Sequence, residues 1–143
     1  MELEKKDQNF YMQDIAHGQI KLHPIVRKII DTPQFQRLRN IKQLGLTSYV
    51  YMSAVHTRFE HSIGTAYLTY KLIKSLRQSN KNGDVITKQE ELCLVIAGLC
   101  HDLGHGPFSH VFERIAPENW SHENMSIVMF DYLIKNNSNV YDK

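Results

Sequence analysis

Two neighbouring segments with helical patterns constrain this sequence most. Between residues 59 and 78, apolar side chains recur at every third or fourth position, which predicts one long helix with an apolar face. A second helix is predicted to begin after Thr87, which forms a capping-box pattern with Glu90. The residues after Glu90 are apolar on nearly every side, so this helix is expected to be central and buried. We therefore predict an all-α fold with little strand content.

Shorter elements are expected before these two helices. A turn and a short strand are predicted within residues 10–22, where apolar and polar residues alternate. Residues 24–30 and 33–44 are predicted to be helices. The second of these would be capped by Thr32 and ended by Gly45. The expected strand content is thus one short β element near the N-terminus.

The remaining segments are expected to be irregular or to support the core. Residues 47–52 are rich in β-favouring residues and favour a short extended piece. Residues 1–9 are expected to be disordered, and 80–84 to be a polar loop. Residues 10–143 are taken as one folded unit. Ser121 is predicted to cap a last helix that faces the core through Met125, Val128, Met129 and Leu133.

The composition argues against several classes of protein. With 143 residues, the chain suffices for one domain with one modest core. Its net charge of +2 is too balanced to indicate nucleic acid or a membrane surface as a partner. No apolar run approaches the length of a membrane span, and the charged start does not resemble a signal peptide. Cys93 and Cys100 are expected to be reduced core residues, which indicates an intracellular protein, nuclear or cytoplasmic.

A possible metal site is indicated where the second long helix ends. His101 and Asp102 follow the apolar run there, and His61 lies near the start of the first long helix. Two helices packed side by side would bring these three side chains together, and a catalytic metal site typically uses about three protein ligands. Two imidazoles and a carboxylate suit Fe, Mn, Co, Ni or Zn. The alternative for each residue alone is an ordinary core histidine or helix-end carboxylate.

Further polar residues lie close to this pair in the sequence. His105 and His110 occupy a glycine-containing turn, from which imidazoles can neutralise a phosphate or transfer a proton. His122, with Glu123 beside it, is a candidate general acid or phosphate contact. Arg58, three residues before His61, is a candidate clamp for an anionic substrate. For each residue alone, the alternative is an ordinary position: an exposed loop for His105 and His110, the first turn of a helix for His122, and the surface for Arg58.

Longer blocks of sequence carry a resemblance to a known family. The blocks are IDTPQFQRLR (30–39), IKQLG (41–45), RFEHSIG (58–64), IAGLCHDLGHGPFSH (96–110) and WSHE (120–123). In these blocks the chain resembles the HD-domain deoxynucleoside triphosphate triphosphohydrolases, in particular the branch whose members combine a SAM domain with the HD domain. The resemblance covers about residues 14–135 and implies a helical HD fold. It also implies a dGTPase-like reaction that hydrolyses a dNTP to a deoxynucleoside and inorganic triphosphate.

The resemblance also implies roles for individual residues. His61, His101 and Asp102 match metal ligands, and the implied metal is Fe, Mn or Zn, with Mg accompanying the nucleotide. The other active-site positions that match are His122 and Glu123 as a catalytic pair, His105 and His110 near the phosphates, Arg58 at a phosphate and Gln43 beside the deoxyribose. Asp31, Gln36 and Arg39 match residues that read guanine at an allosteric site between subunits. A GTP or dGTP activator and a tetramer are therefore expected.

Two departures from the family pattern suggest alternative readings. The family's fourth metal ligand is a downstream aspartate, but the aspartates after His122, Asp131 and Asp142, do not lie in a matching block. Phe10 stands where a lysine is expected at the allosteric site. The chain is therefore expected to be the N-terminal portion of an HD domain. The alternatives are a truncated, non-catalytic module that binds nucleotide or modulates a full-length relative, and an HD phosphohydrolase that acts on another nucleotide.

Overall fold

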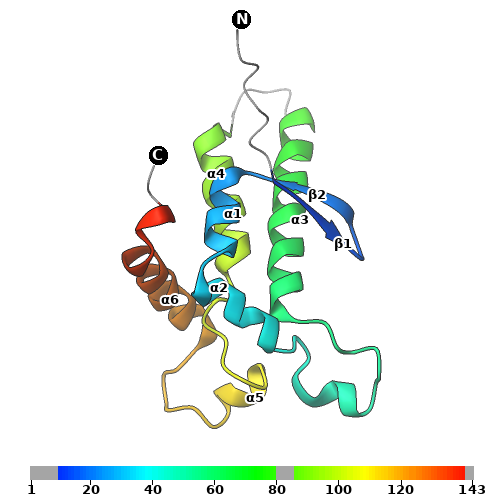
Figure 1. Ribbon diagram of the computed structural model, residues 1–143, viewed down its shortest axis with the longest axis vertical. Coiled ribbons are helices and arrows are strands. Elements are labelled where there is room, and N and C mark those ends of the chain that lie inside the picture. The colour runs from blue at the N-terminus through cyan, green and yellow to red at the C-terminus, as the bar shows by residue number, and fades with distance from the viewer. Residues whose placement is uncertain (1–9, 80–85, 141–143) are drawn as a thin grey trace, which may run out of the picture.

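Two long helices, α3 (Arg58–Ser79) and α4 (Lys88–Cys100), run side by side in opposite directions (Figure 1). The computed structural model describes residues 10–79 and 86–140, so the predicted disorder over 1–9 and the loop over 80–84 lie outside the described residues. Both long helices agree with the sequence periodicity. The capping box is also confirmed, because the Thr87 hydroxyl accepts the backbone N–H of Glu90 and the Glu90 carboxylate accepts that of Thr87.

A β-hairpin covers one side of α3 (Figure 1). Strand β1 (Phe10–Asp14) pairs antiparallel with β2 (Gly18–Leu22). The Asp14 carboxylate accepts the backbone N–H groups of Ala16 and His17, and Gly18 has a φ of 70°, which suits a tight turn. The all-α prediction with a short β element is therefore confirmed, although the element contains two strands rather than one.

Helix α1 (Pro24–Ile30) has the predicted bounds, but the predicted helix over 33–44 is too long and is only partly α-helical. Thr32 does cap α2, which ends after four residues (Pro33–Gln36) and continues as the 3₁₀ helix η1 (Arg37–Asn40). The helix stops there because Ile41 is extended and its carbonyl oxygen accepts the backbone N–H of Arg58. Pairing with the start of α3 thus overrides the local helical pattern.

The predicted extended piece over 47–52 is also wrong. Residues Gly45–Tyr49 form a 3₁₀ helix, η2, so Gly45 opens an element instead of ending one. Gly45 has a φ of 55°, and a Cβ there would lie 3.1 Å from the carbonyl oxygen of Phe108. This close approach, which the local sequence does not reveal, explains why a glycine stands at this position.

The core lies between the hairpin, the first helices and the facing sides of α3 and α4, and includes Ile20, Val26, Phe35, Leu38, Phe59, Ile63 and Leu99. The prediction that α4 is buried all round is wrong, since only Val95, Leu99 and Cys100 on this helix are buried. Leu94 is 46% exposed, and Cys93 is also exposed, contrary to its predicted core position. The reason is that α4 packs mainly against α3, so its opposite side stays largely exposed.

The last helix, α6 (His122–Asn136), begins at the predicted cap, because the Ser121 hydroxyl accepts the backbone N–H of Asn124. Leu133 is buried as expected, but Val128 is 55% exposed and does not face the core. A short helix, α5 (His110–Glu113), precedes α6, and η3 (Ser138–Val140) follows it. Within residues 10–79 and 86–140, no helix has the length and apolar character that crossing a membrane requires.

Candidate active site

The antiparallel arrangement places the start of α3 beside the end of α4 (Figure 1). His61, in the first turn of α3, is thereby brought next to His101 and Asp102, which directly follow α4. The Nε2 atoms of His61 and His101 are 3.1 Å apart. Each of them lies 3.3 Å from Oδ2 of Asp102. The structure thus joins the three predicted metal ligands in one compact triangle.

This triangle fits a divalent metal ion. Bonds of about 2.0–2.1 Å in tetrahedral geometry place neighbouring ligand atoms about 3.3–3.4 Å apart, close to the spacings of 3.1 to 3.3 Å found between these atoms. Nδ1 of His101 lies 2.8 Å from the carbonyl oxygen of Gly98, which can only accept a hydrogen bond. Nδ1 therefore carries the proton in the neutral ring, and the lone pair of Nε2 is directed at the triangle.

Asp102 is buried and enters this site as an anion. Its Oδ2 accepts a hydrogen bond from the Arg58 guanidinium at 2.5 Å, and its Oδ1 lies 3.4 Å from Nε2 of His105. Burial alone would raise the pKa of this carboxyl, but the His101, His105 and His61 imidazoles beside it outweigh burial and hold the pKa well below its ordinary value. Asp102 thus needs no deprotonation to bind a cation.

A second cluster of histidines adjoins the triangle through His105. The rings of His105 and His122 stack with centroids 4.0 Å apart, and the ring of His110 stands edge-on to both. Glu113 connects two of them, since its carboxylate accepts hydrogen bonds from Nδ1 of His110, at 3.0 Å, and from Nδ1 of His122. These bonds lower the pKa of the Glu113 carboxyl to about 2. The Glu113 carboxylate is therefore ionised at neutral pH and contacts two imidazoles.

His105 differs from the other histidines because its side chain is fully buried. Burial is the main reason that its pKa is lowered, and the nearby Arg58 charge adds to the effect. Neither ring nitrogen has a hydrogen-bond partner among the described residues. His105 is thus a neutral ring whose nitrogens make no hydrogen bond with the described residues. It lies between Asp102 of the triangle and His122 of the second cluster.

Sequence reasoning missed Glu113 and favoured Glu123 as the partner of His122. The structure places Glu123 3.4 Å from Nδ1 of His122 with a largely exposed side chain, whereas Glu113 makes the shorter hydrogen bond. The available signal was the spacing of three residues between His110 and Glu113, which places both on one face of a helical turn.

Two further side chains hold the turn after Asp102 in place. Arg37 donates hydrogen bonds to the carbonyl oxygens of Leu103, at 2.7 Å, and His105, at 3.0 Å. The Ser126 hydroxyl, on α6, donates to the carbonyl oxygen of His101 at 2.7 Å. Neither residue was singled out from the sequence. Arg37 lies inside one of the resembling blocks, but the pattern does not indicate its partners.

Of the predicted phosphate and sugar contacts, Arg58 directly contacts a residue of the triangle. Arg58 is only 1% exposed, and its guanidinium is turned toward Asp102. Gln43 is half-buried, and its side-chain oxygen is buried with no hydrogen-bond partner among the described residues. An orphaned acceptor of this kind is costly unless a ligand satisfies it. The substrate-binding roles of both residues remain predictions.

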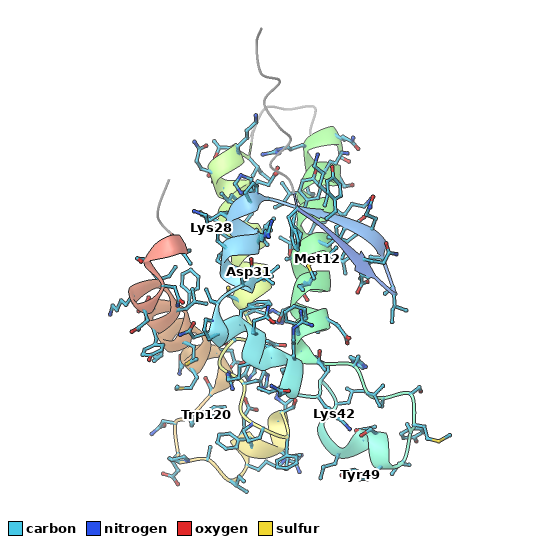
Figure 2. All side chains as sticks on the ribbon, in the orientation of Figure 1. Met12, Lys28, Asp31, Lys42, Tyr49 and Trp120 are labelled. Carbon is cyan, nitrogen blue, oxygen red and sulfur yellow. The ribbon has the colours of Figure 1, made fainter. Side chains whose placement is uncertain are left out.

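The three predicted guanine-reading residues lie along the segment that runs from the end of α1 through α2 to η1. Figure 2 shows the labelled Asp31 beside α1, whereas Lys42 and Tyr49 lie at the end of the molecule that holds η2. Gln36 accepts a hydrogen bond from Nε of Arg39 at 2.7 Å, and the Arg39 guanidinium lies 3.6 Å from the ring centroid of Phe59. Gln36 and Arg39 are thus joined, while the exposed Asp31 interacts with Arg27.

This fold, with a histidine from one helix meeting an adjacent histidine–aspartate pair from the next, defines an HD domain. The HD-domain family model matches residues 58–142, and the chain belongs to this family. An HD domain implies a bound divalent metal, for which the triangle supplies three ligand atoms.

The similar curated proteins narrow the relationship further. Deoxynucleoside triphosphate triphosphohydrolase SAMHD1 of Gallus gallus is 53% identical over 130 residues, covering 87% of this chain and 21% of the relative. The Homo sapiens protein of the same name is 51% identical over 132 residues, covering 88% and 21%. A SAMHD1 homolog of Dictyostelium discoideum is 44% identical over 128 residues, covering 86% and 25%. The resemblance found in the sequence is confirmed. The chain spans about a fifth of the length of the first two relatives.

Proposed function

We propose that this chain carries the metal-binding and phosphate-binding part of a deoxynucleoside triphosphate triphosphohydrolase. The reaction adds water to the α-phosphorus of a dNTP, breaks the bond to the 5′ oxygen, and yields a deoxynucleoside and inorganic triphosphate. The observation that carries the proposal is the meeting of His61, His101 and Asp102 beside a second cluster of three histidines. The identity of about one half to SAMHD1 proteins supports the choice of substrate class.

The triangle would hold Fe, Mn or Zn, and Mg would accompany the nucleotide. When bound, such a metal supplies an activated water and polarises the phosphoryl group. The protein's own contribution is to keep its ligands in the required states. The Gly98 carbonyl fixes the tautomer of His101, and Arg58 orients the Asp102 carboxylate.

The second cluster is suited to moving a proton. Glu113 accepts from Nδ1 of both His110 and His122, which leaves Nε2 of each ring as the atom that exchanges protons. We assign to His122 the delivery of a proton to the departing 5′ oxygen. His110 and the neutral His105 would contact the phosphates, and Glu123 would support His122 only from the exposed side.

Substrate selection and control are assigned to two further groups. Gln43 would use its orphaned oxygen beside the deoxyribose. Asp31, Gln36 and Arg39 would bind the guanine of a GTP or dGTP activator between subunits of a tetramer. The hydrogen bond from Arg39 to Gln36 and the packing of Arg39 on Phe59 hold two of these side chains ready for a planar base.

The decisive experiment is turnover of dGTP by the 143-residue chain with Mn²⁺ or Mg²⁺ and added GTP. We expect deoxyguanosine and triphosphate in equal amounts, and no product from the double variant His101→Ala and Asp102→Ala. His56→Ala, which changes an exposed histidine outside both clusters, should retain turnover. Nucleotide binding without triphosphate release would contradict catalysis by the isolated chain and support a non-catalytic module.

A further inference from the structure

The backbone at Phe108 and Ser109 has a conformation that rarely suits residues with side chains. Their φ angles are 61° and 55°. Ser109 has a ψ of −131°, which places it near the first central position of a type II′ turn, where glycine is preferred. A serine at such a position costs conformational energy that glycine would avoid. Its side chain is therefore expected to make contacts that offset this cost.

The hydroxyl of Ser109 makes two hydrogen bonds in a buried setting. The residue is 3% exposed. Its Oγ donates to the carbonyl oxygen of Lys42 at 2.7 Å and accepts from Nε of Arg58 at 3.1 Å. Both the donor and the acceptor capacity of the hydroxyl are thus used, by partners that lie 67 and 51 residues away in the sequence.

Arg58 connects Ser109 with the metal triangle, because it bonds to both Ser109 and Asp102. Its guanidinium donates from one terminal nitrogen to Oδ2 of Asp102 at 2.5 Å, while the other terminal nitrogen is buried without a partner among the described residues. The contact to Ser109 is therefore a second anchor, which prevents the guanidinium from pivoting about Asp102. A planar group held at two points has a defined direction, whereas one held at a single point does not.

We propose that Ser109 is a positioning residue for the metal ligand Asp102, acting through Arg58. The Lys42 carbonyl fixes the Ser109 hydroxyl, the hydroxyl fixes Arg58, and Arg58 fixes the carboxylate oxygen that faces His61 and His101. The inference deepens the proposed function and rests on it where it concerns the metal. The contact between Ser109 and Arg58 itself exists in the metal-free chain.

Two substitutions separate the hydroxyl from the backbone. Ser109→Ala removes the hydroxyl and keeps the unfavourable backbone angles, whereas Ser109→Gly removes the hydroxyl and fits those angles. If the hydroxyl positions Asp102, both variants should bind Co²⁺ about 10- to 100-fold more weakly than the wild-type chain, with an altered visible spectrum of the bound ion. Because glycine suits the turn, Ser109→Gly is expected to fold even if Ser109→Ala does not.

The second readout is hydrogen exchange of the Arg58 Nε–H, followed by NMR in the chain without metal. We expect a slowly exchanging signal in the wild type and faster exchange in both variants. Wild-type Co²⁺ affinity in Ser109→Gly would overturn the inference, because the hydroxyl would then not be needed to position Asp102. Unchanged Nε–H exchange in both variants would overturn it as well. A wild-type chain that binds no Co²⁺ contradicts the proposed function instead, and the exchange rates still decide the role of Ser109.

Discussion

Gly104 lies directly against the backbone of Ser126, so that a Cβ built on Gly104 would be 2.2 Å from the Ser126 nitrogen. The backbone N–H of Gly104 also donates to the Ser126 hydroxyl at 2.8 Å, and this hydroxyl donates to the carbonyl oxygen of His101. Helix α6, which begins with His122, is thereby fastened to the turn that carries Asp102. This contact therefore fixes the position of His122 on α6 relative to the triangle.

Substituting Gly104→Ala should destabilise the fold strongly. The added methyl group meets backbone atoms of α6, which cannot move aside as a flexible side chain can. We expect the free energy of unfolding to fall by about 3 kcal/mol, the upper end of usual overpacking costs. Chemical denaturation measures this loss. Gly64→Ala is the control, because its Cβ would meet only the His17 side chain at 3.3 Å. A change of less than about 1 kcal/mol for Gly104→Ala would contradict the packing described.

The variant Ser126→Ala tests the hydrogen bonds at the same contact. It leaves the buried Gly104 N–H without its acceptor, and we expect a loss of about 1–3 kcal/mol in the free energy of unfolding. Urea denaturation compares it with Ser53→Ala, an exposed serine for which no loss is expected. Equal stability of the two variants would show that the hydroxyl of Ser126 is dispensable.

Removing one imidazole should empty the metal triangle. His101→Ala deletes the ligand whose Nε2 lies within 3.3 Å of both other ligand atoms, and two remaining donors rarely retain a transition metal. We expect the bound Mn, Fe or Zn, measured by elemental analysis after dialysis, to fall from about one per chain to near zero. The exposed His56→Ala should keep its metal. Full metal content in His101→Ala would exclude this ligand assignment.

Glu113 should make the stability of the chain depend on acidic pH. The hydrogen bonds from His110 and His122 lower the pKa of its carboxyl from 4.5 to about 2 in the folded chain. The resulting stabilisation is therefore fully present above pH 4.5 and is lost as the pH falls towards 2. The difference in melting temperature between wild type and Glu113→Gln should shrink across this window. The exposed Glu118→Gln should show no such trend, and a constant difference for Glu113→Gln would contradict the pairing.

Local signals in the sequence were sufficient for the long elements. The capping box at Thr87 and the cap at Ser121 each involve contacts within three residues, so the sequence alone contains both partners. The spacing of apolar residues likewise predicted α3, and Pro24 indicated the start of the first helix. The meeting of His61 with His101 and Asp102 was expected from packing two such helices side by side, and the structure brings the three together.

Features that depend on distant partners were not predictable in the same way. Ile41 leaves the helical path because it pairs with Arg58, and Gly45 is required by Phe108, which is 63 residues further along the chain. The spacing of His110 and Glu113 indicates that pair, but only the fold shows that His122 also contacts Glu113. The roles of the individual site residues in catalysis likewise remain predictions, because geometry alone does not test them.

The two cysteines differ in burial, so only one of them, Cys93, is accessible to a thiol-reactive label. Cys100 is buried, and burial raises the pKa of its thiol to about 12, so it is protonated and shielded at neutral pH. Cys93 is exposed on the same helix, seven residues before it, or about 10 Å along the axis. A maleimide dye should therefore label Cys93 selectively. A fluorophore there would report on events at the end of α4 without any engineered cysteine.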